Sequence, residues 1–228
     1  MKTLFIKTEK KLQKQFFSLD FSPLPKKIGI LCTIQFISFS KKIAEMLEKN
    51  SRKVFLSKPV QSKKCKQKIA YPCQILGCDL SAAKQTEKKV DAFLFLGSGS
   101  WHLSQLALLT SKPIFFLEGQ KIKLFPKEKR KRLHSFRKGV ISKFLFSDKV
   151  GILVSTKPGQ QQLKTALKMR KKLQKQLSKK AFLFLADSIN KAELENFSPR
   201  AWLNTVCPGL CFDIPSINPA ELEDIFKN

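Results

Sequence analysis

The chain has 228 residues, of which 43% are hydrophobic, and it carries a formal net charge of +27. This hydrophobic content is too high for a disordered chain, and apolar runs such as AFLFLG are far shorter than a membrane span. The N-terminal stretch MKTLFIKTEKKLQKQ has scattered charges where a signal peptide has an apolar core. We therefore predict a cytoplasmic protein with no membrane segment.

Strands and helices alternate along the first half of the chain. Strands are predicted at residues 2–6, 26–35, 53–58, 90–97 and 112–118, and helices at 39–50, 81–89 and 103–110. The longer strands, such as KKIGILCTIQ and VDAFLFLG, are apolar on both faces. Such strands are typical of a parallel sheet whose two faces are covered by helices.

A long basic helix at residues 126–147 separates this part from a second part with the same plan. Its predicted apolar stripe consists of Leu133, Phe136, Val140, Ile141 and Phe144. After it we predict strands at 149–155, 181–187 and 201–206, and helices at 159–180 and 191–197. The fold class is therefore α/β, with two related parallel-sheet units and covering helices. We place the two domains at residues 27–147 and 148–228.

The positive charge is concentrated in the middle of the chain. Residues 121–180 hold 20 basic and 2 acidic side chains, whereas residues 181–228 hold 3 and 7. A field of this strength favours RNA or an acidic protein surface as a partner. The codon usage of an AT-rich genome, which favours Lys and Phe, would produce the same excess without any function. The sequence leaves both interpretations open.

The loops that follow the predicted strands hold the most distinctive residues. Ligands of open α/β sheets bind beyond the carboxyl ends of the strands, and three such loops are GSGSWH (97–102), KPGQ (157–160) and CPG (207–209). GSGSWH lacks the third glycine of the dinucleotide-binding fingerprint, and the sequence has no phosphate loop ending in Gly-Lys-Ser/Thr. By itself the glycine loop is more typical of a tight strand–helix turn, although His102 at its end could contact a ligand.

Cysteines in a cytosolic chain indicate a metal site, catalysis or simple burial rather than disulfides. The chain has Cys32, Cys65, Cys73, Cys78, Cys207 and Cys211. Cys32 lies inside an apolar strand, where core burial is the default. The spacings C-x4-C (Cys73, Cys78) and C-x3-C (Cys207, Cys211) differ from the C-x2-C of a zinc knuckle. Cys78 and Cys207 lie at loop ends, one in each unit, so two facing units could bring both thiolates to one iron–sulfur cluster.

Several blocks occur in the order found in one enzyme family. They are IGILCTIQ, CQILGCDLSAA, VDAFLFLGSGSWHLSQLALLTSKPIFFLE, VGILVSTKPGQ and WLNTVCPGL followed by INPAELE. From about Lys26 to Glu223 the chain resembles the Dph1/Dph2 family of diphthamide-synthesis enzymes, archaeal and eukaryotic. The resemblance implies three related α/β domains, each giving one cysteine to a central [4Fe–4S] cluster whose open iron binds S-adenosylmethionine. It further implies radical transfer of the 3-amino-3-carboxypropyl group to a histidine of translation elongation factor 2. The archaeal enzymes of this family are homodimers and the eukaryotic ones heterodimers.

The resemblance assigns roles to particular residues. Cys78 resembles the cluster ligand of the second domain and Cys207 that of the third. Residues of the cofactor-binding loops are matched by Gly97, Gly99, His102, Gly159 and Gln160. Cys73 and Cys211 are candidates for the third ligand inside this chain, but small core residues are the more common explanation for both.

The chain also differs from the family pattern. The first domain with its cysteine has no counterpart, and residues 1–26 resemble only a remnant and a linker. Cys73 stands where the family usually has glycine, and Gly209 where it has arginine. We therefore predict a component of 2-(3-amino-3-carboxypropyl)histidine synthase that needs a separate first-domain protein. The alternatives are a non-catalytic partner subunit, or a basic RNA- or ribosome-binding protein that has lost the cluster.

Overall fold

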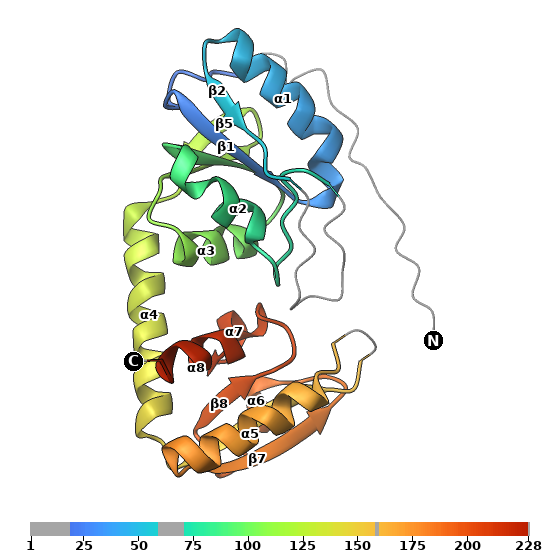
Figure 1. The fold of residues 1–228 in the computed structure, drawn as a ribbon, viewed down its shortest axis with the longest axis vertical. Coiled ribbons are helices and arrows are strands. Elements are labelled where there is room, and N and C mark those ends of the chain that lie inside the picture. Colours follow the sequence, from blue (N-terminus) through green and yellow to red (C-terminus); the bar gives the residue numbers. More distant parts are fainter. Residues whose placement is uncertain (1–18, 59–70, 158–159, 228) are drawn as a thin grey trace. The chain divides into compact units, whose positions relative to one another are not determined.

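Two separate sheets organise the chain, and the division between the units that they form falls between Lys131 and Arg132. The computed structural model describes residues 19–58, 71–157 and 160–227. Figure 1 shows the elements of each unit. The strand predicted at residues 2–6 and the side chain of Cys65 lie outside the described residues.

The first unit contains a five-stranded sheet in the order β2-β1-β3-β4-β5. Its strands are β1 (Lys27–Cys32), β2 (Lys53–Phe55), β3 (Ala92–Leu96), β4 (Ile114–Glu118) and β5 (Lys121–Leu124). Neighbouring strands from β2 to β4 are parallel, whereas β5 runs antiparallel to β4. The helices are α1 (Ile37–Lys49), α2 (Ser81–Thr86) and α3 (Ser100–Leu109), with 3-10 turns at Ile34–Phe36 and Glu87–Lys89.

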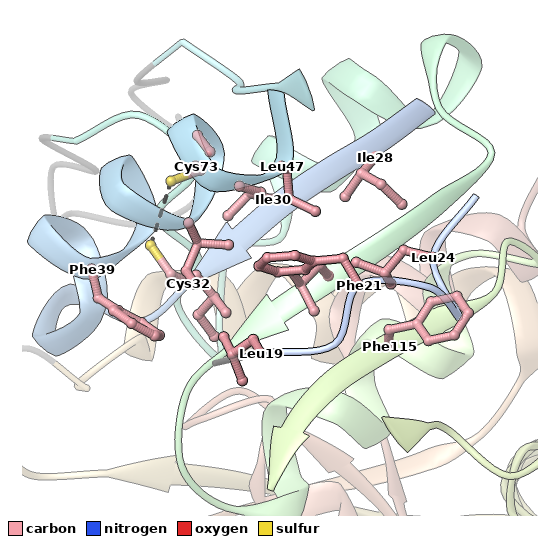
Figure 2. Packing of buried hydrophobic residues seen from close by; sticks show 14 of the residues in the cluster. Leu19, Phe21, Leu24, Ile28, Ile30, Cys32, Phe39, Leu47, Cys73 and Phe115 are labelled. Carbon is pink, nitrogen blue, oxygen red and sulfur yellow. Dashed lines mark hydrogen bonds between the residues drawn. The ribbon is translucent and has the colours of Figure 1, made fainter. Parts of the chain in front are cut away.

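The core of the first unit is built by strand residues that are apolar on both faces. All five residues of β3 are buried, and Ile28 and Ile30 of β1 belong to one cluster with Leu47 of α1 (Figure 2). A Cβ at Gly29 would lie 2.8 Å from the ring of Phe93, so the glycine lets this ring lie against β1. Each such buried side chain contributes about 1.5–3 kcal/mol to stability.

The second unit contains a four-stranded sheet in the order β7-β6-β8-β9. Its strands are β6 (Lys149–Ser155), β7 (Lys180–Ala186), β8 (Ala201–Asn204) and β9 (Ser216–Ile217), and all neighbours are parallel. The remaining helices are α4 (Lys127–Phe146), α5 (Leu163–Leu177), α6 (Lys191–Leu194), α7 (Leu210–Asp213) and α8 (Pro219–Ile225). Within the described residues, no helix is both long and apolar enough to cross a membrane.

The predicted fold class is confirmed, because both sheets are mostly parallel and carry helices. The division between the units nevertheless falls before most of α4, and not at residue 147. The reason is that Val140 and Phe144 of α4 are buried in the core of the second unit. Phe136 of the predicted apolar stripe is 41% exposed, and its neighbour Arg137 is buried instead.

Candidate functional site

Cys78 lies at the tip of a tight turn in the first unit. The turn is closed by two backbone hydrogen bonds of 3.0 Å, in which the N–H groups of Leu76 and Asp79 each donate to the other's carbonyl oxygen. The buried Asp79 side chain accepts a bond of 2.8 Å from the N–H of Ser81, the first residue of α2. Cys78 itself is exposed. The turn therefore holds an accessible thiol on a backbone that is fixed on both sides.

The glycine loop after β3 packs against this turn. Trp101 lies directly on Gly77, where a Cβ would come within 1.4 Å of the indole ring. His102 is half-buried between two aromatic rings, with its centroid 5.9 Å from Phe95 and 4.6 Å from Trp101. Burial lowers the pKa of His102, which favours its neutral imidazole. The structure thus brings the predicted glycine loop and the predicted ligand Cys78 together.

Different structural constraints favour glycine at the two glycine positions of this loop. A Cβ at Gly97 would lie 2.3 Å from the ring of Phe95. Gly99 precedes α3 with φ +85°, a left-handed conformation that disfavours other residues, and nothing lies within 4 Å of its Cβ position. The space at Gly99 therefore leaves room for a ligand to approach the backbone at the start of α3.

Replacing Gly77 with Ala is expected to displace Trp101 and to lower the free energy of unfolding by about 1–3 kcal/mol, since the added methyl group overlaps the ring. Tryptophan fluorescence and denaturant unfolding measure both effects. A matched control is Gly139→Ala in α4, where nothing lies within 4 Å of the new Cβ. That change should stabilise the helix by up to about 1 kcal/mol. Unchanged fluorescence and stability in Gly77→Ala would contradict the contact.

Cys207 lies in the second unit, three residues after the end of β8. Its carbonyl oxygen accepts hydrogen bonds from the Asn204 side chain at 2.6 Å and from the N–H of Leu210 at 2.9 Å. The Thr205 hydroxyl donates to the carbonyl oxygen of Leu153 on β6 at 2.7 Å. Cys207 is half-buried. This thiol also lies on a fixed turn at the carboxyl end of a parallel sheet.

The residues predicted around Cys207 are only partly described. Gly159 lies outside the described residues, and Gln160 is exposed with its N–H donating to the carbonyl oxygen of Lys157 at 3.1 Å. Because β6 and β8 are parallel neighbours, the loops that follow them lie at the same edge of the sheet. Gln160 and Cys207 therefore belong to one edge, as the sequence predicts.

A polar network connects Cys207 to α4. The Asn204 amide also donates to the Asn218 side chain at 3.1 Å. Asn218 begins α8 as its N-cap, and Glu221 completes a capping box with it. Glu221 in turn binds the buried Arg137 guanidinium at 2.6 Å. The sequence Asn-Pro-Ala-Glu at 218–221 carries the signal for this cap, but nothing in it indicates Arg137.

The other described cysteines are buried. Cys211 is 4% exposed and burial raises the pKa of its thiol, which disfavours the thiolate that a metal needs. Cys73 packs against Cys32 with 3.4 Å between the sulfurs, as the dashed line in Figure 2 shows. The contact with Cys73, together with burial, raises the pKa of Cys32. Both candidates for a third ligand therefore occupy core positions.

Cys73 also has an unusual backbone. Its φ of +54° lies in the left-handed region, where a side chain costs about 1–2 kcal/mol. This conformation is a physical reason for glycine to be usual at this position in the family that the sequence resembles.

Thiolates are the usual ligands of iron–sulfur clusters, so one accessible thiol on a fixed turn in each unit has the right chemistry. Two thiols are too few for a complete metal site. In the part of the chain that the structure describes, no group of three or more His, Cys, Asp or Glu side chains could hold a metal ion. A cavity at the end of β7, lined by Phe184, Leu185 and Phe197 among others, has a volume of about 150 Å³. It is too small for a typical cofactor pocket and contains none of the predicted site residues.

Comparison with known proteins gives a consistent result. Residues 1–227 match the family model described as "Putative diphthamide synthesis protein". The chain is 30% identical over 210 residues to the 2-(3-amino-3-carboxypropyl)histidine synthase of Pyrococcus horikoshii. The alignment covers 90% of this chain and 58% of that protein.

Solved structures agree with this match. The crystal structure of Dph2 from Pyrococcus horikoshii superposes with a TM-score of 0.73 at 29% identity, covering 89% of this chain and 58% of the other. The crystal structure of the same protein with a 4Fe-4S cluster has the same TM-score and identity, and covers 90% and 58%. The chain thus spans less than two thirds of the length of these relatives. The chain belongs to the diphthamide synthesis family.

Proposed function

We propose that the chain is a component of a 2-(3-amino-3-carboxypropyl)histidine synthase and acts in the first step of diphthamide biosynthesis. In this proposal it supplies two ligands, Cys78 and Cys207, to a [4Fe–4S] cluster. The observation that carries it is the placement of one accessible thiol on a hydrogen-bonded turn in each unit, while Cys32, Cys73 and Cys211 are buried. The first unit would correspond to the family's second domain and the second unit to its third.

The chain's own residues have defined tasks in this proposal. Cys78 and Cys207 hold the cluster, and Gly97, Gly99, His102, Gly159 and Gln160 line the binding site of S-adenosylmethionine. When bound, the cluster would supply the electron for radical transfer of the 3-amino-3-carboxypropyl group to a histidine of translation elongation factor 2. The open backbone at Gly99 lets the cofactor approach the start of α3, and the neutral His102 can accept or donate one hydrogen bond there.

The third cluster ligand of this proposal comes from outside the described residues. The described residues offer only two accessible thiols, whereas three cysteines leave one iron open for the cofactor. We propose that the third ligand comes from a separate cytoplasmic first-domain protein with a single loop cysteine. In the same proposal, this chain forms a homodimer or a heterodimer with a related chain. Residues 1–26 would be the remnant of that domain and a linker. Because only two accessible thiols are present among the described residues, a non-catalytic partner subunit is the second candidate.

The test is a transfer assay with and without the partner. The chain is purified anaerobically, alone or with a protein carrying the first-domain cysteine, and reduced. It is then incubated with elongation factor 2 and S-adenosylmethionine labelled in the aminocarboxypropyl group. We expect labelled elongation factor only when both proteins are present. Transfer by the chain alone would contradict the need for a partner, and a cluster-loaded assembly without transfer would favour the non-catalytic subunit.

A further inference from the structure

One face of α5 carries a row of lysines that the proposed synthase function does not use. Lys164, Lys168, Lys171 and Lys175 recur at intervals of four, three and four residues, so they lie along one side of the helix. All four are exposed, and the opposite side with Ala166, Met169 and Leu173 is buried in the core. With a rise of about 1.5 Å per residue, this α5 lysine row is about 16 Å long.

The α5 lysine row has little compensating negative charge among the described residues. Glu223 of α8 is close to it: the hydrogen bond from Lys172 and, to a smaller degree, the charge of Lys168 lower the pKa of the Glu223 carboxyl. Helix α5 contains no Asp or Glu, and among the described residues none of the four lysines takes part in an ion pair. The neighbouring Lys172, which is not in the row, pairs with Glu223 of α8 at 2.6 Å.

The row is also electrostatically unfavourable for the helix. Lys164 lies in the first turn, where the helix dipole disfavours a positive charge, and no acid accompanies it. Lys164 and Lys168, like Lys171 and Lys175, form like-charge pairs at i,i+4. Because this arrangement weakens an isolated helix, an anionic ligand that neutralises it is the simplest compensation. A biased codon composition accounts for the number of lysines, but it does not place them on one acid-free helix face.

From this surface we infer that α5 binds the phosphate backbone of a nucleic acid, independently of base sequence. Each strand of a duplex presents one phosphate per about 3.4 Å of axis, so the row spans about five phosphates. Lysine, as a flexible point charge, suits a regular backbone that needs no bidentate geometry.

Two other anionic partners fit this surface less well. Protein interfaces are depleted in Lys and enriched in aromatic residues and Arg, whereas the exposed basic residues of α5 are the four lysines of the row and a single arginine, Arg170. A membrane-surface helix needs a free apolar face, and the apolar face of α5 is buried on the sheet.

The test compares two variants that remove the same number of charges from the full chain. The first replaces Lys164, Lys168, Lys171 and Lys175 with Gln, a good helix former. The control replaces Lys41, Lys49, Lys84 and Lys88 with Gln; these lysines are also exposed, but they lie in the first unit. Binding to RNA and DNA duplexes of about 20 base pairs and to single-stranded RNA is measured between about 50 and 200 mM salt.

We expect wild-type binding to fall steeply with salt. Removing the α5 lysine row should reduce the slope of log K against log salt by about 3.6 on a duplex, which is 0.9 for each of four phosphate contacts. It should also weaken binding at least tenfold at low salt, whereas the control should stay close to wild type. Replacing the same four lysines with Arg should preserve binding, which separates lost charge from lost structure.

Three results would overturn this inference. They are wild-type binding that is insensitive to salt, equal losses in the two Gln variants, and binding of polyglutamate as tight as that of the nucleic acids. The last result would assign the surface to an acidic protein. None of these measurements requires the cluster, so failure here leaves the proposed synthase function untouched.

Discussion

Glu221→Ala is expected to lower the free energy of unfolding of the second unit by about 3–5 kcal/mol, because it leaves the buried Arg137 without its counter-charge. Two guanidinium nitrogens of Arg137 donate to the Glu221 carboxylate at 2.6 and 3.2 Å, and a third donates to the Ser216 carbonyl oxygen at 2.9 Å. The two side chains are only 8% and 29% exposed, so water replaces little of the lost interaction. Glu221 also accepts a bond from the Asn218 N–H at 2.8 Å, and the cap of α8 is lost with it.

Denaturant unfolding of three further variants separates the causes. Replacing the pair together, as Arg137→Met with Glu221→Leu, should cost less than Glu221→Ala alone, since no charge then stays buried without a partner. Glu128→Ala, which removes an exposed pair with Lys131 at 3.8 Å, should have little effect. Asn204→Ala should loosen the Cys207 turn while leaving the ion pair in place. A Glu221→Ala protein as stable as wild type would show that the ion pair contributes nothing.

Cys78→Ala and Cys207→Ala are each expected to abolish most iron binding by the anaerobically reconstituted assembly. If three thiolates hold the cluster, removing one leaves only two, which do not retain it. Iron and sulfide content and the visible absorbance of the cluster measure the loss. Cys78 is exposed and Cys207 is half-buried, so their removal should change the unfolding free energy little.

The matched controls are Cys32→Ala and Cys211→Ala. Both thiols are buried, at 0% and 4% exposure, so these variants should lose stability but keep their iron. Unchanged iron content in Cys78→Ala and Cys207→Ala would refute the ligand assignment. Loss of iron in Cys211→Ala, with the fold intact, would instead make Cys211 the third ligand and remove the need for a first-domain protein. The same experiment tests the prediction that both thiolates bind one cluster.

The strands and long helices of this fold could be predicted from local pattern. β1, β3 and β6 are apolar on both faces and almost entirely buried, and this is the strongest strand signal that a sequence carries. β5 was missed because KIKL alternates with lysine and lies at the sheet edge, where Leu124 is 46% exposed. β9 was missed because it has only two residues, too few for any periodicity.

The sequence by itself determined the α/β class, the family and the two candidate ligand cysteines, because these depend on residues that are adjacent or regularly spaced in the chain. Only the tertiary structure decided what holds those cysteines in place. Trp101 packs on Gly77 from the first turn of α3, 24 residues away, and Arg137 reaches Glu221 across 84 residues. Hydropathy predicts Phe136 in the core and Arg137 outside, and the structure reverses them. A buried arginine is stable only where a carboxylate and a carbonyl oxygen from distant parts of the sequence pair with it. A local sequence pattern does not predict such pairing.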